Sequence, residues 1–195
     1  MGATYTDVQL DALAEIANIG SSTAATALSA LIGTPVDVST SSARAMLLAD
    51  AIEEAGPGEM IVTSILIPVC GDLDAVVLMV MQPSTEDAAS RLMGVELHTE
   101  VGDSALVEMG NILGASYLGA LVAMTGLRLE PAPPEMVRDM LAVSLTDALL
   151  VDVHDEEVLV LESTLSVASQ LCSPTVMFIP TSGGVGDILD RMFGS

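Results

Sequence analysis

The chain of 195 residues contains no lysine, and five arginines are its only strongly basic side chains. Against them stand 27 aspartates and glutamates, which give a net charge of −22. Proteins bind nucleic acids through lysine and arginine contacts to the phosphates. The charge balance therefore argues against DNA or RNA as a partner.

An excess of acidic over basic residues this large is typical of proteins from a high-salt cytoplasm. Salt there shortens the reach of self-repulsion, and hydrated carboxylates keep the protein soluble. We therefore expect a halophilic source. The alternative is an ordinary acidic protein that meets a basic partner.

Cysteine and aromatic residues are also scarce. Two cysteines, Cys70 and Cys172, are too few for a disulfide scaffold or a typical zinc site, and we expect both to be buried thiols. Aromatic residues make up 2% of the chain and hydrophobic residues 51%, so the core must be mainly aliphatic. The length suits one domain with a large core or two small ones.

Two uncharged stretches, 16–36 and 109–127, reach the length of a membrane span. Both are rich in Gly, Ser, Thr and Ala, and each contains an asparagine, so we interpret them as core helices. The N-terminus lacks the basic and apolar segments of a secretory signal. We expect a cytoplasmic protein that does not contact the membrane.

One segment of the chain occurs twice. Residues 11–33 and 104–126 align without gaps and are identical at 9 of 23 positions. An amphipathic helix needs a repeated apolar spacing, but it does not need the same carboxylate and carboxamide at the same spacing. The repeat therefore indicates function as well as fold.

The pattern of elements around this segment is duplicated too. Each half of the chain predicts a helix, a short strand, a helix, two strands and a helix. The expected elements are 7–32, 36–38, 42–54, 60–69, 75–82 and 84–93 in the first half, and 100–125, 127–130, 135–150, 157–167, 174–180 and 185–193 in the second.

We therefore predict an α+β fold that forms a single domain over 1–195. Its two halves, at about 7–94 and 100–194, are expected to be related by an internal pseudo-twofold axis. The strands would merge into one mixed or antiparallel sheet, and the two long helices would carry the repeated polar residues.

Three of these polar residues lie on one stripe of each long helix, within about 60° of one another at 100° per residue. An asparagine has both a donor and an acceptor, so it can orient a water molecule. The alternative is a plain solvated helix face, which two copies in register disfavour. The residues are Asp11, Glu15 and Asn18 in the first helix and Ser104, Glu108 and Asn111 in the second.

This spacing resembles that of the CheC/CheX/FliY family of chemotaxis phosphatases. The family motif is Asp or Ser, three residues, Glu, two residues, Asn, then 22 residues and Pro. The second copy, which continues to Pro134, matches it fully. The first copy matches as far as Asn18 but has Ser41 at the proline position. Two motifs in a chain of this length resemble CheC more than CheX or FliY.

The resemblance implies a phosphatase that hydrolyses the aspartyl-phosphate of phosphorylated CheY, a receiver domain. Asn18 and Asn111 would each hold the attacking water in line with phosphorus. Glu15 and Glu108 would each pair with a lysine of the receiver and fix the register. Such catalysis works by positioning, because phosphoryl transfer asks little covalent chemistry of the protein.

The resemblance also implies roles for the remaining motif residues. Asp11 and Ser104 would help to bind the receiver, and Pro134 would be structural, ending the extended segment before the next helix. The protein would need no cofactor or metal of its own, because the receiver would supply the Mg²⁺.

Other functions fit the same resemblance. Proteins similar to CheC also bind CheD, a receptor-modifying deamidase, so the chain could act as a CheD-binding module with little phosphatase activity. After the phosphatase and the CheD-binding module, the third hypothesis is a structural part of the flagellar motor switch, as in FliY relatives.

Overall fold

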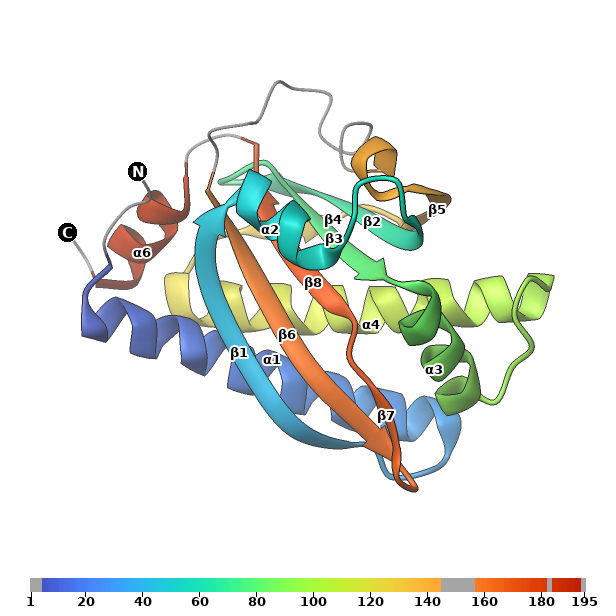
Figure 1. Cartoon of the computed structure of the whole chain (residues 1–195). Helices are drawn as coiled ribbons and strands as arrows, with labels where there is room; N and C mark the ends of the chain where they lie inside the picture. The colour runs from blue at the N-terminus through green and yellow to red at the C-terminus, as the bar shows by residue number, and fades with distance from the viewer. Residues whose placement is uncertain (1–4, 145–156, 182–183, 194–195) are drawn as a thin grey trace.

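The computed structural model describes residues 5–144, 157–181 and 184–193. Eight strands form one sheet, and helices cover both of its faces (Figure 1). In chain order the elements are α1 (Asp7–Ile32), β1 (Asp37–Leu47), α2 (Leu48–Ala55), β2 (Ile61–Gly71), β3 (Ala75–Met81), α3 (Pro83–Met93), α4 (Glu100–Thr125), β4 (Leu129–Pro131), β5 (Glu135–Met140), β6 (Glu157–Val167), β7 (Gln170–Cys172), β8 (Thr175–Pro180) and α6 (Val185–Phe193).

The strands follow the order β1-β6-β8-β3-β2-β4, with β5 also paired to β2 and β7 to β6. All the described strand pairs are antiparallel. This confirms the predicted α+β domain and settles the sheet as antiparallel. The central strand β3 is buried along its whole length, as expected for a strand covered on both faces.

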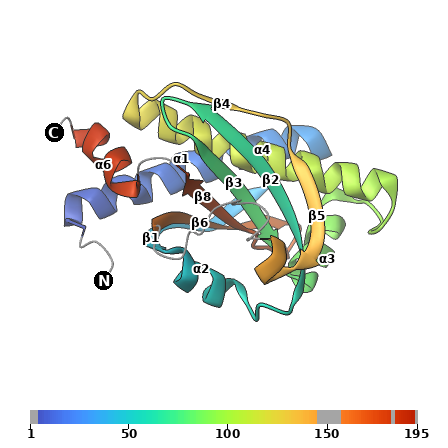
Figure 2. The ribbon, with the colours of Figure 1, turned by 90° about the horizontal axis from the view of Figure 1, so that it is seen from above.

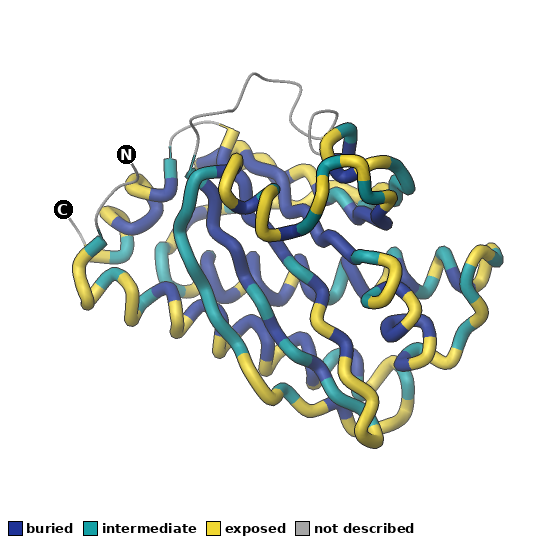
Figure 3. The backbone as a smooth tube through the Cα atoms, viewed as in Figure 1, coloured by how far each residue is buried: buried dark blue, intermediate teal, exposed yellow. Residues whose placement is uncertain are grey.

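The long helices α1 and α4 lie side by side on one face of the sheet and run in opposite directions (Figures 1 and 2). Together with α3 and α6 they bury the larger of two apolar clusters, which contains Leu13, Leu106 and Leu113. The shorter helix α2 covers part of the other face and buries the second cluster. Figure 3 shows the buried residues concentrated between these layers.

The two sequence halves exchange strands within the sheet. Strand β1 from the first half pairs with β6 of the second, and β5 from the second half pairs with β2 of the first. Each half therefore supplies an outer strand to the other. The exact extents of the predicted halves remain a prediction.

Local sequence signals explain the two long helices. Thr6 caps α1 through a capping box with Gln9, and Gly33 ends it in the left-handed conformation. Thr99 caps α4, and Gly126 ends it in the same way as Gly33. Both helices occupy the predicted ranges.

Two predicted helices begin too early, at the same place in each half. Residues 42–47 continue β1 instead of opening a helix, so that helix begins only at Leu48. Residues 135–140 form β5 rather than the start of the helix expected at 135–150. Residues 141–144 are helical as predicted, and 145–150 lie outside the described residues. Both segments are rich in good helix formers, and pairing with the sheet overrides that local preference.

Burial corrects one further prediction and supports another. Cys172 is buried as expected, whereas Cys70 is exposed. Among the described helices, α4 alone is long and apolar enough to cross a membrane. Since it packs against α1, α3 and the sheet, α4 is a core helix, as the sequence indicated.

Candidate functional site

The first polar stripe lies on the outer surface of α1. Asp11, Glu15 and Asn18 are all exposed, while Leu13 and Ile16 on the opposite side of the helix are fully buried. The amphipathic pattern therefore fixes which face of α1 the motif presents. Its carboxylate and carboxamide are open to a partner from solution.

The second stripe repeats this arrangement on α4. Ser104 and Glu108 are exposed and Asn111 is half-buried, whereas Leu106 and Met109 are completely buried. Gly110 lets this part of the helix approach the sheet, because a Cβ there would lie 2.8 Å from the side chain of Ile65. The backbone that carries the α4 stripe therefore packs closely against the sheet.

The two stripes form separate sites. Because α1 and α4 run in opposite directions, the N-terminal half of each helix, which carries its motif, lies at the opposite end of the pair (Figure 1). Each motif is therefore contacted by a different strand, β1 at the α1 motif and β5 at the α4 motif.

The spacing between the two helices is set by a glycine next to the first motif. A Cβ on Gly20 would overlap the ring of Tyr117, so the absence of a side chain lets the aromatic ring of α4 pack on α1. The hydroxyl of Tyr117 is in turn hydrogen-bonded to Ser163 of β6. Burial raises the pKa of the Tyr117 phenol, which keeps it neutral in this contact.

Ser41 approaches the first motif from β1. Its Oγ donates a hydrogen bond of 2.6 Å to Oδ1 of Asn18. The sequence position that holds proline in the family motif therefore does lie beside the asparagine at this site. The structure joins these two residues although 22 others separate them in the chain.

Pro134 occupies the corresponding position in the second half. It is half-buried and directly precedes β5, so it does not open a helix as its sequence position suggested. Strands β4 and β5 both contact α4. The side chain of Asn111 forms no hydrogen bond with any residue that the structure describes.

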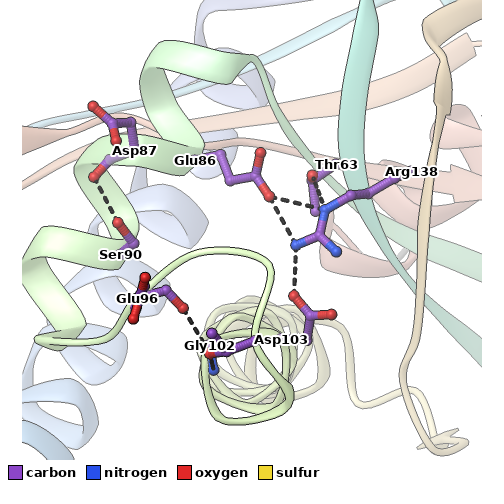
Figure 4. Close-up of polar contacts among 9 residues, drawn as sticks. Thr63, Glu86, Asp87, Ser90, Glu96, Gly102, Asp103 and Arg138 are labelled. Carbon is purple, nitrogen blue, oxygen red and sulfur yellow. Dashed lines mark hydrogen bonds and ion pairs between the residues drawn. The ribbon is translucent and has the colours of Figure 1, made fainter.

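An ion-pair cluster that the sequence did not reveal holds the start of the second motif (Figure 4). Arg138 of β5 donates to Asp103 over 2.7 Å and to Glu86 of α3 over 2.9 Å. It also donates to the Thr63 hydroxyl of β2. Since Asp103 directly precedes Ser104, Arg138 ties the first turns of the motif helix to α3 and the sheet.

Burial and charge make this cluster more than a surface contact. The side chain of Glu86 is 10% exposed and that of Arg138 is 25% exposed. The hydrogen bond from Arg138 lowers the pKa of Asp103, and the two carboxylates raise the pKa of the guanidinium. The one sequence signal for this cluster is Arg138 itself, because the chain has only five strongly basic side chains.

These stripes can act chemically by orienting groups rather than by covalent attack. Each carries a carboxylate that can accept from a cation and a carboxamide that can hold a water. Among the described residues, no three His, Cys, Asp or Glu side chains are grouped as ligands for a metal ion.

Comparison with known proteins gives consistent similarities. The chain matches a family model described as the CheC-like family over residues 8–40, which include the whole first motif as far as Asn18. It is 31% identical over 150 residues to the CheY-P phosphatase CheC of Bacillus subtilis, across 73% of this chain and 72% of that protein.

Solved structures show the same fold. FliY of Thermotoga maritima superposes with a TM-score of 0.72 at 19% identity, over 98% of this chain and 97% of that one. The FliM middle domain from H. pylori gives 0.70 at 10% identity, over 96% and 99%. CheX from Desulfovibrio desulfuricans gives 0.51 at 15% identity, over 85% and 99%. At these identities the likeness concerns the fold alone.

Proposed function

From the premise that the chain belongs to the CheC-like family, we propose that it hydrolyses the aspartyl-phosphate of phosphorylated CheY in the cytoplasm. The observation that carries this proposal is the pair of polar stripes on α1 and α4. Each presents a glutamate and an asparagine at the same spacing on the outward face of a helix whose other face is fixed in the core.

The asparagines themselves support this assignment. Asn18 and Asn111 are the only two asparagines in the chain, and both stand at the same position of the repeated motif. A solvated helix face would not require its two asparagines to coincide in this way. Each carboxamide is proposed to hold the water that attacks the phosphorus of CheY-P.

In the proposed reaction the receiver supplies the reacting groups, and this protein positions the attacking water. The receiver brings the phosphoryl group and the Mg²⁺ that offsets its charge. Glu15 or Glu108 pairs with a cationic side chain of the receiver, and the asparagine three residues later then holds the attacking water in line with the phosphorus. A rigid helix suits this role, because positioning errors of about 1 Å can cost about 10²-fold in rate.

An exposed valine extends each stripe by one helical turn. Val8 is 61% exposed and Val101 is 70% exposed, and each precedes the first motif residue by three positions. Apolar side chains at matching places on both helices fit contact with a protein partner. Replacing both by serine is expected to raise the KM for CheY-P while leaving kcat unchanged.

The decisive experiment follows the loss of phosphate from phosphorylated CheY with Mg²⁺ in molar KCl. The protein should accelerate the decay, and Asn18→Ala combined with Asn111→Ala should abolish the acceleration. Thr23→Ala on α1, whose hydroxyl bonds only to the backbone of its own helix, provides the matched control.

The same variants separate this proposal from its alternative. A CheD-binding module would leave CheY-P decay unchanged while the protein still bound CheD. In that case the double alanine variant and the wild-type protein would give equal decay rates, and the phosphatase proposal would be abandoned. Retained CheD binding by a variant that has lost phosphatase activity would assign the two functions to different surfaces.

A further inference from the structure

The two motif sites differ in what surrounds their asparagines. Oδ1 of Asn18 accepts a hydrogen bond of 2.6 Å from Ser41. Asn111 has no hydrogen-bond partner among the described residues, and Pro134 at the position equivalent to Ser41 has no hydroxyl to offer. The carboxamide is therefore engaged at the α1 site and unengaged at the α4 site.

The contact at the α1 site is built into the sheet. Ser41 lies opposite Ser163 in the register of β1 and β6. Ser163 is hydrogen-bonded to Tyr117 of α4, so this face of the two strands is the one that the long helices cover. The next residue, Ser42, instead bonds to Glu162. Strand alternation thus turns Ser41 toward α1 and Ser42 away from it.

The engaged atom is the one that the proposed reaction needs. A water that attacks phosphorus uses its own lone pair for the new bond, so its hydrogens must be accepted elsewhere. A carboxamide has one acceptor atom, the oxygen, while its nitrogen only donates. That oxygen has two lone pairs, so the Ser41 hydroxyl occupies one of them and restrains the orientation in which the other can meet the water.

We propose that Ser41 is a positioning residue that restrains Asn18 and makes the α1 site the slower of two unequal phosphatase sites. This inference rests on the proposed function. The α4 site, with Oδ1 of Asn111 unengaged, carries most of the turnover. Removing the Ser41 hydroxyl is expected to raise kcat of the α1 site by roughly two- to twelvefold, the range for one hydrogen bond.

The test isolates each site in turn. The Asn111→Ala variant leaves only the α1 site, and the Asn18→Ala variant leaves only the α4 site. We expect the first to turn over CheY-P more slowly than the second. Adding Ser41→Ala to the first should raise kcat with little change in KM, and adding it to the second should change neither.

Two further variants distinguish the hydroxyl from the strand. In the background of Asn111→Ala, Ser41→Thr keeps a hydroxyl and should keep the low kcat. In the same background, Ser42→Ala removes a neighbouring hydroxyl on the other face and should also leave kcat unchanged.

The outcomes are separable. An unchanged or lower kcat for Ser41→Ala in the background of Asn111→Ala, with the wild-type protein active, would overturn the restraint by Ser41. If the wild-type protein itself failed to accelerate CheY-P decay, the proposed function would fail instead. Equal kcat for the two single-site variants would also contradict the inference.

Discussion

The guanidinium of Arg138 is hydrogen-bonded to Asp103 over 2.7 Å, one residue before Ser104 opens the second motif. The same guanidinium reaches Glu86, whose side chain is almost fully buried. The start of the α4 stripe is therefore held by an arginine of an outer strand. This contact links the stability of the fold to the placement of the site.

Replacing Arg138 by alanine is expected to lower the free energy of unfolding by about 2–4 kcal/mol. The reason is that Glu86 would remain buried without its partner, which costs far more than losing a surface pair. Urea unfolding of the variant and the wild-type protein measures the difference.

Arg128→Ala supplies the control for this prediction. Arg128 pairs with Asp72 at the surface and its side chain is 88% exposed, so its loss should lower the stability far less than the loss of Arg138. Equal effects of the two replacements would show that the Arg138 cluster gives no more stability than an exposed pair.

The lowered pKa of Asp103 predicts how this contact responds to acid. A carboxyl whose folded pKa lies below its unfolded value near 3.8 stabilises the fold above that pH. The contribution is lost as pH falls through the folded pKa. Asp103→Asn should therefore be less stable than the wild-type protein at pH 7, and the difference should shrink below about pH 4.

Urea unfolding at a series of pH values from 7 to 3 checks this prediction. Glu53→Gln serves as the control, because Glu53 is an exposed residue of α2, whereas the hydrogen-bond partners of Arg138 lie in β2, α3 and α4. A difference between Asp103→Asn and the wild-type protein that stayed constant with pH would contradict the assigned cause.

Gly20 should be intolerant of a side chain. Gly20→Ala places a Cβ against the ring of Tyr117, and relieving that overlap requires the two long helices to shift. We expect a loss of about 1–3 kcal/mol in the free energy of unfolding, as for other overpacked cores. The α1 stripe would move with its helix, so phosphatase activity of the Asn111→Ala variant should fall as well.

Gly119→Ala is the matched control on the partner helix. A Cβ at Gly119 would meet nothing within 4 Å. Alanine is the better helix former by about 1 kcal/mol, so this replacement should stabilise the protein slightly. If both alanine variants were equally stable, close packing at Gly20 would not be what sets the helix spacing.

Prediction from sequence succeeded where local and tertiary preferences agree. The helices α1 and α4 have capping residues, a sustained apolar period and a terminal glycine, so their bounds followed from the chain alone. Prediction failed at β1 and β5, whose Ala, Arg, Met, Leu and Glu residues favour helices. Those residues are strands because they pair with β6 and β2 of the other half, which no local pattern shows.

The candidate site shows the same division. The spacing of Glu15 and Asn18 and its repetition were visible in the sequence, because both pairs belong to single helices. The bond between Ser41 and Asn18 and the cluster around Arg138 join residues from different elements. Their partners could be found only once the sheet register was known.

Salt should stabilise the folded protein strongly. The chain carries a net charge of −22, and the repulsion among its carboxylates opposes compaction. The Debye length falls from about 10 Å at 0.1 M to about 3 Å at 1 M, so molar salt removes most of this repulsion. We therefore expect the thermal unfolding midpoint to rise steeply between 0.1 and about 2 M KCl.

A variant with fewer acids tests whether charge is the cause. Glu53, Glu59, Glu130 and Asp190 are exposed, and replacing them by the corresponding amides removes four negative charges without disturbing the core. This variant should unfold at a higher temperature than the wild-type protein at low salt and gain less from added KCl. A midpoint of the wild-type protein that did not change with salt would remove the basis for a halophilic origin, because screening would then have nothing to relieve.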